Sequence, residues 1–200
     1  MKFFVNFLSS FRIFASFAIV GTMMCDKYLA TFILFLLAAL SDFFDGYLAR
    51  KYNACTKLGL VLDSVADKFL IVNTYIMLCL IMQRWFIIIP IIVMIARELY
   101  VSGLREFMGT QKITLAHPKT RLAPGKIKAT MQMISIIAFL GCLWISVSLG
   151  GAITNLNLFV YTLSILFNVG IFSLWFALAT SIWSAAQYTV DFANQLKKIN

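Results

Sequence analysis

Charged side chains are scarce in this sequence of 200 residues. Asp, Glu, Lys and Arg together make up 12% of it, whereas hydrophobic residues make up 62% and Phe alone occurs 19 times. Soluble domains usually carry about 25% charged and about 45–50% apolar residues. A chain with so few charges cannot cover a soluble globule with polar side chains. The composition therefore predicts that lipid is the solvent of this protein.

Cysteine and histidine are also rare, with four cysteines and one histidine in the chain. The cysteines are widely spaced, so the sequence contains no Cys-x-x-Cys pair and no zinc-binding spacing. We interpret them as structural thiols in apolar helices. His117 stands in a polar stretch and is interpreted as an ordinary surface residue.

The formal net charge is +9. In a soluble protein such an excess would indicate a nucleic-acid partner. In an apolar chain, basic residues are instead expected at the cytoplasmic edge of a bilayer. We therefore predict no nucleic-acid binding.

Long apolar runs separated by short polar stretches predict an all-α, polytopic membrane protein, because a backbone in lipid must satisfy its own hydrogen bonds. A short amphipathic helix lying in the membrane interface is expected at residues 2–10, and the N-terminal segment is read as retained rather than cleaved. Residues 1–200 are expected to form a single membrane domain. The six expected transmembrane helices are 11–25, 27–51, 57–82, 85–109, 124–149 and 156–190.

The distribution of Lys and Arg predicts the orientation of these helices. Lys27 and Arg84 are the only basic residues at the connections near 26 and 84, and the connection 150–155 has none. The other connections and both ends of the chain hold most of the remaining basic residues: Lys2, Arg12, Arg50, Lys51, Lys57, Arg105, Lys112, Lys119, Arg121, Lys126, Lys128, Lys197 and Lys198. Since positive charge accumulates on the cytoplasmic side, both termini and the 105–128 loop are expected in the cytoplasm.

Four of the eight acidic residues lie inside segments that otherwise suit lipid: Asp42, Asp45, Asp63 and Asp67. Inserting a carboxylate at the bilayer centre costs at least about 2.5 kcal/mol of free energy, so carboxylates in such segments indicate a functional role. Spacings of three and four residues put each pair on one helix face. At 1.5 Å per residue, Asp45 and Asp63 lie roughly 8–9 Å from the inner helix ends. All four can thus converge in one cytoplasm-facing pocket.

Carboxylates placed together repel, and hard divalent cations relieve that repulsion, so Mg²⁺ or Mn²⁺ is the expected ligand. Gly46 and Gly59 flank the cluster, where glycine serves either close helix packing or the approach of a ligand to the backbone. Arg50 has two interpretations, a positive charge at the membrane edge or a phosphate ligand.

These residues follow the pattern Asp42-x-x-Asp45-Gly46-x-x-Ala49-Arg50, then eight residues, then Gly59-x-x-x-Asp63-x-x-x-Asp67. The pattern resembles the signature of the CDP-alcohol phosphotransferase family at all eight fixed positions. The resemblance extends to the six-span layout and to nearly the whole chain.

The resemblance implies two metal ions, Mg²⁺ or Mn²⁺, that hold the diphosphate of a CDP-lipid. Asp42, Asp45 and Asp63 would be metal ligands, and Asp67 would be both a ligand and the general base. The residues that would bind the CDP-lipid are Gly46, Ala49, Arg50, Thr56, Gly59, Asn6 and Ser9. The candidates for the phosphate of the acceptor are Arg97, Arg105, Lys126 and Lys128, although positive charge at the cytoplasmic edge also accounts for the lysines.

Four further stretches resemble the branch of the family whose acceptor is sn-glycerol 3-phosphate and whose lipid donor is CDP-diacylglycerol: Lys57–Lys68, Ile95–Glu98, Gly103–Glu106 and Gly125–Gln132. Ser64 and Val5 depart from that branch, which usually has Pro at both positions. The simplest interpretation of Glu98 and Glu106 is ion pairing with the neighbouring arginines.

The resemblance further implies a bacterial inner-membrane enzyme of phospholipid biosynthesis with a cytoplasmic active site, and a homodimer by analogy. Two alternatives remain open at this point. One is a synthase of the same family with another acceptor, namely inositol phosphate, serine or phosphatidylglycerol. The other is a cation transporter, whose carboxylates would also line a membrane pocket.

Overall fold

The computed structural model of the chain describes residues 2–52, 57–110, 124–148 and 156–196, with side chains for residues 10–41, 65–107, 127–148 and 156–194. Six helices occupy these ranges: α1 (Lys2–Met24), α2 (Tyr28–Tyr52), α3 (Lys57–Met82), α4 (Trp85–Thr110), α5 (Pro124–Ser148) and α6 (Leu156–Leu196). No strand occurs in these ranges, so the all-α prediction is confirmed for them.

The helix ends agree with the sequence prediction to about a residue, with two differences. The segments 2–10 and 11–25, expected as separate helices, form the single helix α1, because neither Pro nor Gly interrupts the chain before Gly21. The last helix was expected to end at 190, yet α6 continues to Leu196, since the polar residues that follow 190 include no helix breaker.

Four of the helices are long and apolar enough to cross a membrane, with candidate spans at Val65–Met82, Trp85–Phe107, Ile127–Ser148 and Leu156–Asn194. In α1 and α2, shorter apolar stretches cover Ser10–Met24 and Tyr28–Ser41. The protein is therefore a multi-pass membrane protein, and the six-span count is compatible with the described residues. Helix α6 has 41 residues. At 1.5 Å per residue it is about 61 Å long, roughly twice the thickness of a hydrocarbon core.

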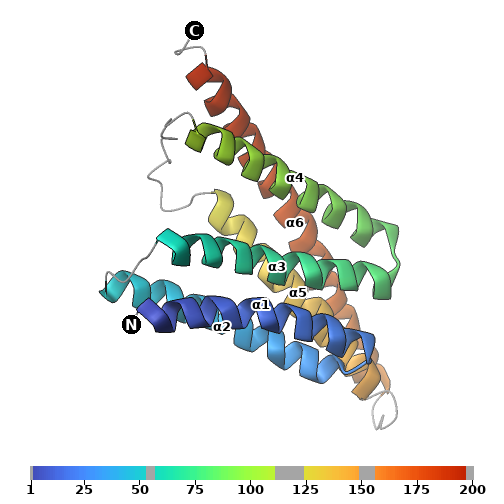
Figure 1. The fold of residues 1–200 in the computed structure, drawn as a ribbon. Coiled ribbons are helices and arrows are strands. Elements are labelled where there is room, and N and C mark those ends of the chain that lie inside the picture. The colour runs from blue at the N-terminus through green and yellow to red at the C-terminus, as the bar shows by residue number, and fades with distance from the viewer. Residues whose placement is uncertain (1, 53–56, 111–123, 149–155, 197–200) are drawn as a thin grey trace.

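The helices form one bundle (Figure 1), in which α3 contacts α1, α4 and α5. Helix α1 lies against both α2 and α3, and the most extensive interface joins α5 to α6. Helix α4 packs on α6, and α5 also contacts α2. Because successive helices reverse direction, the chain start, the ends of α2, α4 and α6 and the starts of α3 and α5 lie toward the same end (Figure 1). We refer to this as the N-terminal end of the bundle.

Two tight turns at the opposite end reverse the chain. Asp26 between α1 and α2 has a φ of 56°, and Gln83 between α3 and α4 has a φ of 48°. A positive φ is uncommon outside glycine but is tolerated by polar residues in short turns. In the first turn, the Tyr28 hydroxyl also donates a hydrogen bond of 2.7 Å to the Asp26 carboxylate. These turns hold α1 beside α2 and α3 beside α4.

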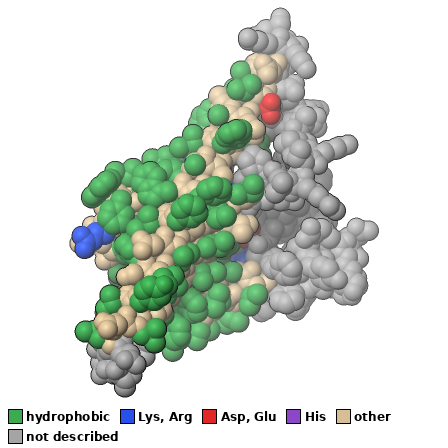
Figure 2. Space-filling model, turned by 180° about the vertical axis from the view of Figure 1, so that it is seen from behind, with side chains coloured by type: hydrophobic (Ala, Val, Ile, Leu, Met, Phe, Trp, Pro, Cys, Tyr) green, Lys and Arg blue, Asp and Glu red, His purple; other side chains and the backbone are tan. Residues whose placement is uncertain are grey.

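The outer surface of the bundle is apolar. Hydrophobic side chains cover most of the described face in Figure 2, and charged side chains are sparse on it. Large residues such as Phe14, Trp85 and Phe172 expose 70% or more of their surface. Apolar patches of this extent mark an interaction with lipid or protein, which agrees with helices that cross a membrane.

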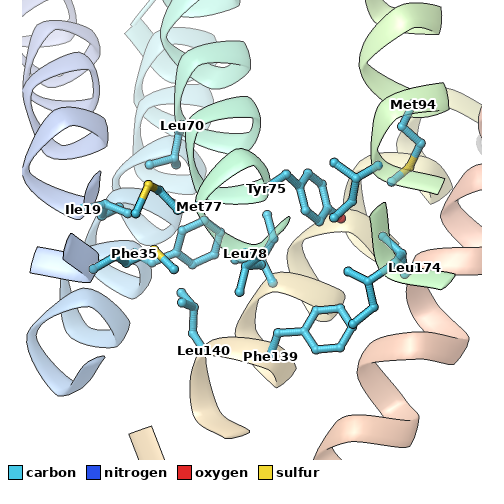
Figure 3. Close-up of a cluster of buried hydrophobic side chains, with 14 of the residues drawn as sticks. Ile19, Phe35, Leu70, Tyr75, Met77, Leu78, Met94, Phe139, Leu140 and Leu174 are labelled. Carbon is cyan, nitrogen blue, oxygen red and sulfur yellow. The ribbon is translucent and has the colours of Figure 1, made fainter. Parts of the chain in front are cut away.

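All six helices supply side chains to the core, and those from α4 are Ile87, Ile91 and Met94. Ile19 of α1, Phe35 of α2, Leu78 of α3, Phe139 of α5 and Leu174 of α6 are all fully buried (Figure 3). Dispersion contacts between such close-packed side chains, together with small residues at helix interfaces, are the main source of stability when lipid surrounds the bundle. The core thus fixes the relative positions of the helices that carry the polar residues described next.

Candidate functional site

An ion pair between α1 and α3 lies toward the N-terminal end of the bundle. Arg12 Nη1 donates a hydrogen bond to Asp67 Oδ1. The Arg12 side chain is fully buried, with 0% exposure, whereas the Asp67 side chain is 36% exposed. The carboxylate is therefore partly accessible at the surface of the bundle, whereas the guanidinium is enclosed by the protein.

The other signature residues lie near this pair along the backbone. Asp42 and Asp45 are in the second half of α2, and Asp63 is one turn before Asp67 in α3. Their side chains lie outside the described residues. Where side chains are described, no group of three metal-binding residues occurs. The backbone does place these halves of α2 and α3 toward the N-terminal end of the bundle, with α1 alongside both helices (Figure 1).

The residues proposed for the CDP-lipid fall in the same part of the chain. Asn6 and Ser9 are in the first half of α1, Gly46, Ala49 and Arg50 are in the last turns of α2, and Gly59 is in the first turn of α3. Thr56 lies outside the described residues, as do the side chains of the others. Their assignment to the CDP-lipid stays a prediction.

A second group of charged residues joins α4 to α5. Lys128 Nζ forms an ion pair with Glu98 Oε1, and Glu98 Oε2 lies 3.7 Å from Arg97 Nη1. Lys128 is buried, with a side chain only 6% exposed, so its ammonium group depends on the Glu98 carboxylate for a counter-charge. Arg97 Nε also donates to the backbone carbonyl of Ser181 in α6, at 2.9 Å.

Arg105 extends this group toward the end of α4. Its Nη2 donates a hydrogen bond of 2.6 Å to the Tyr188 hydroxyl of α6, and its guanidinium lies 4.8 Å from the centre of the Tyr188 ring. Arg105 itself is exposed. Lys126 is in the first turn of α5, and its side chain lies outside the described residues. The structure thus brings together Arg97 and Lys128 through Glu98, and it places Arg105 on α4 as an exposed cation.

A small cavity of about 30 Å³ lies beside the second group. Its polar lining residues are Lys68, Glu98 and Gln132, and Lys68 Nζ donates a 2.6 Å hydrogen bond to Ser102 Oγ. Beneath them, the buried Tyr75 hydroxyl bonds to Ser135 Oγ at 2.7 Å. A cavity of this size holds water-sized groups. Most of its lining is apolar, with Ile71, Val72, Met94 and Ile95 among the lining residues, so the charged side chains border an apolar space.

Arg12 is the residue whose role the sequence did not reveal. The sequence assigns Arg12 to the positive inner side of the membrane and to the stretch Asn6–Arg12, which resembles the amphipathic entry helix of the family. The sequence feature that indicates a role for Arg12 is its position inside an apolar run, because a cation there requires a partner. The partner itself could not be identified, since Asp67 is 55 residues away in the sequence.

Together these features define a class of protein: a helical, multi-pass membrane protein with buried ion pairs between its helices. The comparison with known sequences gives the particular family. Residues 3–183 match the CDP-alcohol phosphatidyltransferase family. Because the match covers most of the chain, the protein belongs to that family.

Similar bacterial proteins carry the name CDP-diacylglycerol–glycerol-3-phosphate 3-phosphatidyltransferase. The protein from Rickettsia felis is 45% identical over 104 residues, which are 52% of this chain and 54% of the relative. The protein from Rickettsia bellii is 41% identical over 134 residues, covering 66% of this chain and 71% of the relative. The protein from Cereibacter sphaeroides is 45% identical over 111 residues, covering 54% and 48%. The aligned part of this chain thus spans about half the length of most of these relatives.

Proposed function

We propose that the protein transfers the phosphatidyl group of CDP-diacylglycerol to sn-glycerol 3-phosphate, giving phosphatidylglycerophosphate and CMP. The observation that carries this proposal is the family signature around Asp67, in a chain that belongs to the CDP-alcohol phosphatidyltransferases. The names of the similar bacterial proteins support the choice of glycerol phosphate as the acceptor.

Asp67 would act as the general base. Its carboxylate takes the proton of an acceptor hydroxyl while that oxygen attacks the lipid-side phosphorus. A new P–O bond forms to glycerol phosphate, the P–O bond to CMP breaks, and CMP leaves. The 36% exposure of the Asp67 side chain fits this role, because a base must be accessible to the substrate.

A divalent cation fits the donor set of the site. Asp42, Asp45, Asp63 and Asp67 are hard oxygen donors at helical spacings on α2 and α3, which suits two Mg²⁺ or Mn²⁺ ions. Bound there, the ions would neutralise the diphosphate of the CDP-lipid and stabilise the departing CMP. The exposed carboxylate of Asp67 is the described member of this set.

Each of the two substrates would be bound by its own set of residues near the helix ends. Asn6, Ser9, Gly46, Ala49, Arg50, Thr56 and Gly59 would hold the CDP-diacylglycerol. Arg97, Arg105, Lys126 and Lys128 would hold the acceptor phosphate. Phosphoryl transfer depends mainly on this kind of positioning and charge neutralisation.

The membrane arrangement completes the proposal. Residues 1–200 would form one domain with six spans in the bacterial inner membrane, and the active site would face the cytoplasm. The segment 2–10 would lie in the membrane interface as the first part of α1. A homodimer is the expected oligomer.

The test is an assay of the detergent-purified protein with CDP-diacylglycerol, Mg²⁺ and labelled glycerol 3-phosphate, in which CMP and labelled lipid are measured. We expect both products in the wild type, and a loss of at least about 100-fold in Asp67→Asn, the scale of a general base. CMP release only with another alcohol would keep the transferase and overturn the acceptor. A folded wild type that turns over no acceptor would overturn the enzyme and favour cation transport.

A further inference from the structure

Arg12 is an unusual residue for the place it occupies. It is the largest fully buried side chain of the described residues, and it lies in α1 close to the buried apolar side chains of Ala15 and Ile19. A guanidinium keeps its charge in any protein setting. A buried cation is tolerated only when a carboxylate and hydrogen bonds compensate for the lost water. The position therefore calls for a specific partner.

That partner is the carboxylate proposed as the catalytic base. Arg12 Nη1 bonds to Asp67 Oδ1, and the buried guanidinium approaches from the interior while Asp67 stands 36% exposed. The guanidinium is planar and its N–H groups point in fixed directions. A bond to Oδ1 holds this oxygen toward α1 and so reduces the number of orientations open to the carboxylate. Arg12 thus restricts the Asp67 side chain.

Ordinary packing of α1 against α3 does not require this pair. Four residues along α1, the buried Ser16 makes the next polar contact to α3, in which Asn73 Nδ2 donates to Ser16 Oγ at 3.4 Å. The apolar side chains of Ile19, Met23 and Leu70 supply the rest of the core near this seam. The contact of Ser16 is thus a matched control, because it joins the same two helices without touching Asp67.

We propose that Arg12 is a positioning residue of the phosphatidyl transfer, which holds the Asp67 carboxylate in the direction required to take the acceptor proton. The inference rests on the proposed function, in which Asp67 is the base. Under this proposal α1 contributes a residue to the reaction centre, in addition to packing against α2 and α3. Loss of the guanidinium then affects the rate of the chemical step, and it leaves the affinity for both substrates largely unchanged.

The experiment compares Arg12→Gln, Arg12→Lys and the control Ser16→Ala by steady-state CMP release and by thermal unfolding in detergent. In Arg12→Gln we expect kcat to fall about 100-fold, with KM for each substrate changed by less than about threefold. In Arg12→Lys, which keeps a cation but not the planar guanidinium, we expect kcat to fall by about threefold to tenfold. In Ser16→Ala we expect wild-type kcat.

A purely structural role predicts a different result, namely a lower unfolding temperature with kcat per folded protein unchanged in every variant. Folded Arg12→Gln with wild-type kcat would overturn the inference. If Arg12→Gln does not yield folded protein, Arg12→Lys decides: a reduced kcat at unchanged KM supports the inference, and wild-type kcat overturns it.

A double-mutant cycle of Arg12→Gln and Asp67→Asn tests the contact without any assay of turnover. We expect the double variant to lower the unfolding temperature by less than the sum of the single variants. Once Arg12 has been replaced by Gln, Asp67→Asn no longer breaks an ion pair. Strictly additive shifts would overturn the inference. A folded wild type that releases no CMP would overturn the proposed function and this inference with it, whereas wild-type turnover with an active Arg12→Gln overturns this inference alone.

Discussion

Gly170 of α6 allows the close approach of α5 and α6, which share the most extensive helix interface of the bundle. A Cβ built at Gly170 would lie 2.7 Å from Cε1, 2.9 Å from Cδ1 and 3.0 Å from Cζ of the Phe139 ring. Phe139 is fully buried, and its ring also contacts Phe167, with centroids 6.1 Å apart. Because the ring has no free space to enter, Gly170→Ala must move the two helices apart or force Phe139 out of its rotamer.

The size of the effect follows from a comparison with a second glycine. A Cβ at Gly141 of α5 would meet its nearest neighbour, the Phe32 ring, at 3.7 Å, which is ordinary contact. Both substitutions gain about 1 kcal/mol of helix propensity, since Ala is the better helix former. Overpacking a core costs about 1–3 kcal/mol. The propensity gain cancels between the variants, so Gly170→Ala should be about 1–3 kcal/mol less stable than Gly141→Ala.

Thermal unfolding of the two variants in the same detergent measures this difference. For a chain of this length, each kcal/mol corresponds to about 2–4 °C, so Gly170→Ala should unfold several degrees below Gly141→Ala. Equal unfolding temperatures would show that Phe139 can relax without cost, and would refute the close packing of α5 on α6 at this point.

Two further predictions concern the charged residues and the topology. Lys128→Met should destabilise the protein by about 1–3 kcal/mol in thermal unfolding, because the Glu98 carboxylate loses its hydrogen bond to a charged partner and keeps only Arg97, 3.7 Å away. Adding Glu98→Gln should recover part of the loss, and a double variant no more stable than the single one would contradict the ion pair. The topology can be tested in cells that carry single-cysteine variants, with a membrane-impermeant maleimide. The reagent should label Cys25, which is exposed in the turn after α1, from the outer side. It should label Cys55, which lies outside the described residues, only after permeabilisation. The reverse labelling pattern would contradict the predicted orientation.

The sequence was sufficient to predict the helices, because each apolar run is bounded by a short polar stretch. Helix α3 was predicted at 57–82 and occupies Lys57–Met82. The polar end of α6 was not predicted, because hydrophobicity identifies the part of a helix that lies in lipid and carries no information on how far the helix continues into water. The continuity of α1 was missed for a related reason, since an amphipathic segment and an apolar one can share one helix.

The charged contacts were less predictable than the helices. Glu98 was expected to pair with an arginine of its own helix, and Arg97 does lie 3.7 Å from it, yet the closer contact comes from Lys128 of α5. Lys128 had been assigned to the acceptor on charge alone, and that assignment stays a prediction. Such partners depend on how helices distant in sequence are packed, and a single sequence contains no direct record of that packing.

The contact between Arg12 and Asp67 also bears on how the chain is made. The two residues are 55 positions apart, so α1 and α2 leave the ribosome before the carboxylate of α3 exists. A cation in an apolar segment resists transfer into lipid, at about 2.5–3.5 kcal/mol when it lies at the helix centre. We therefore expect the first helix to reach its final depth only when the third arrives, and the three helices to enter the membrane as one unit of biosynthesis. A nascent chain stalled before Asp67 should hold its first helix more loosely in the bilayer than the finished protein does.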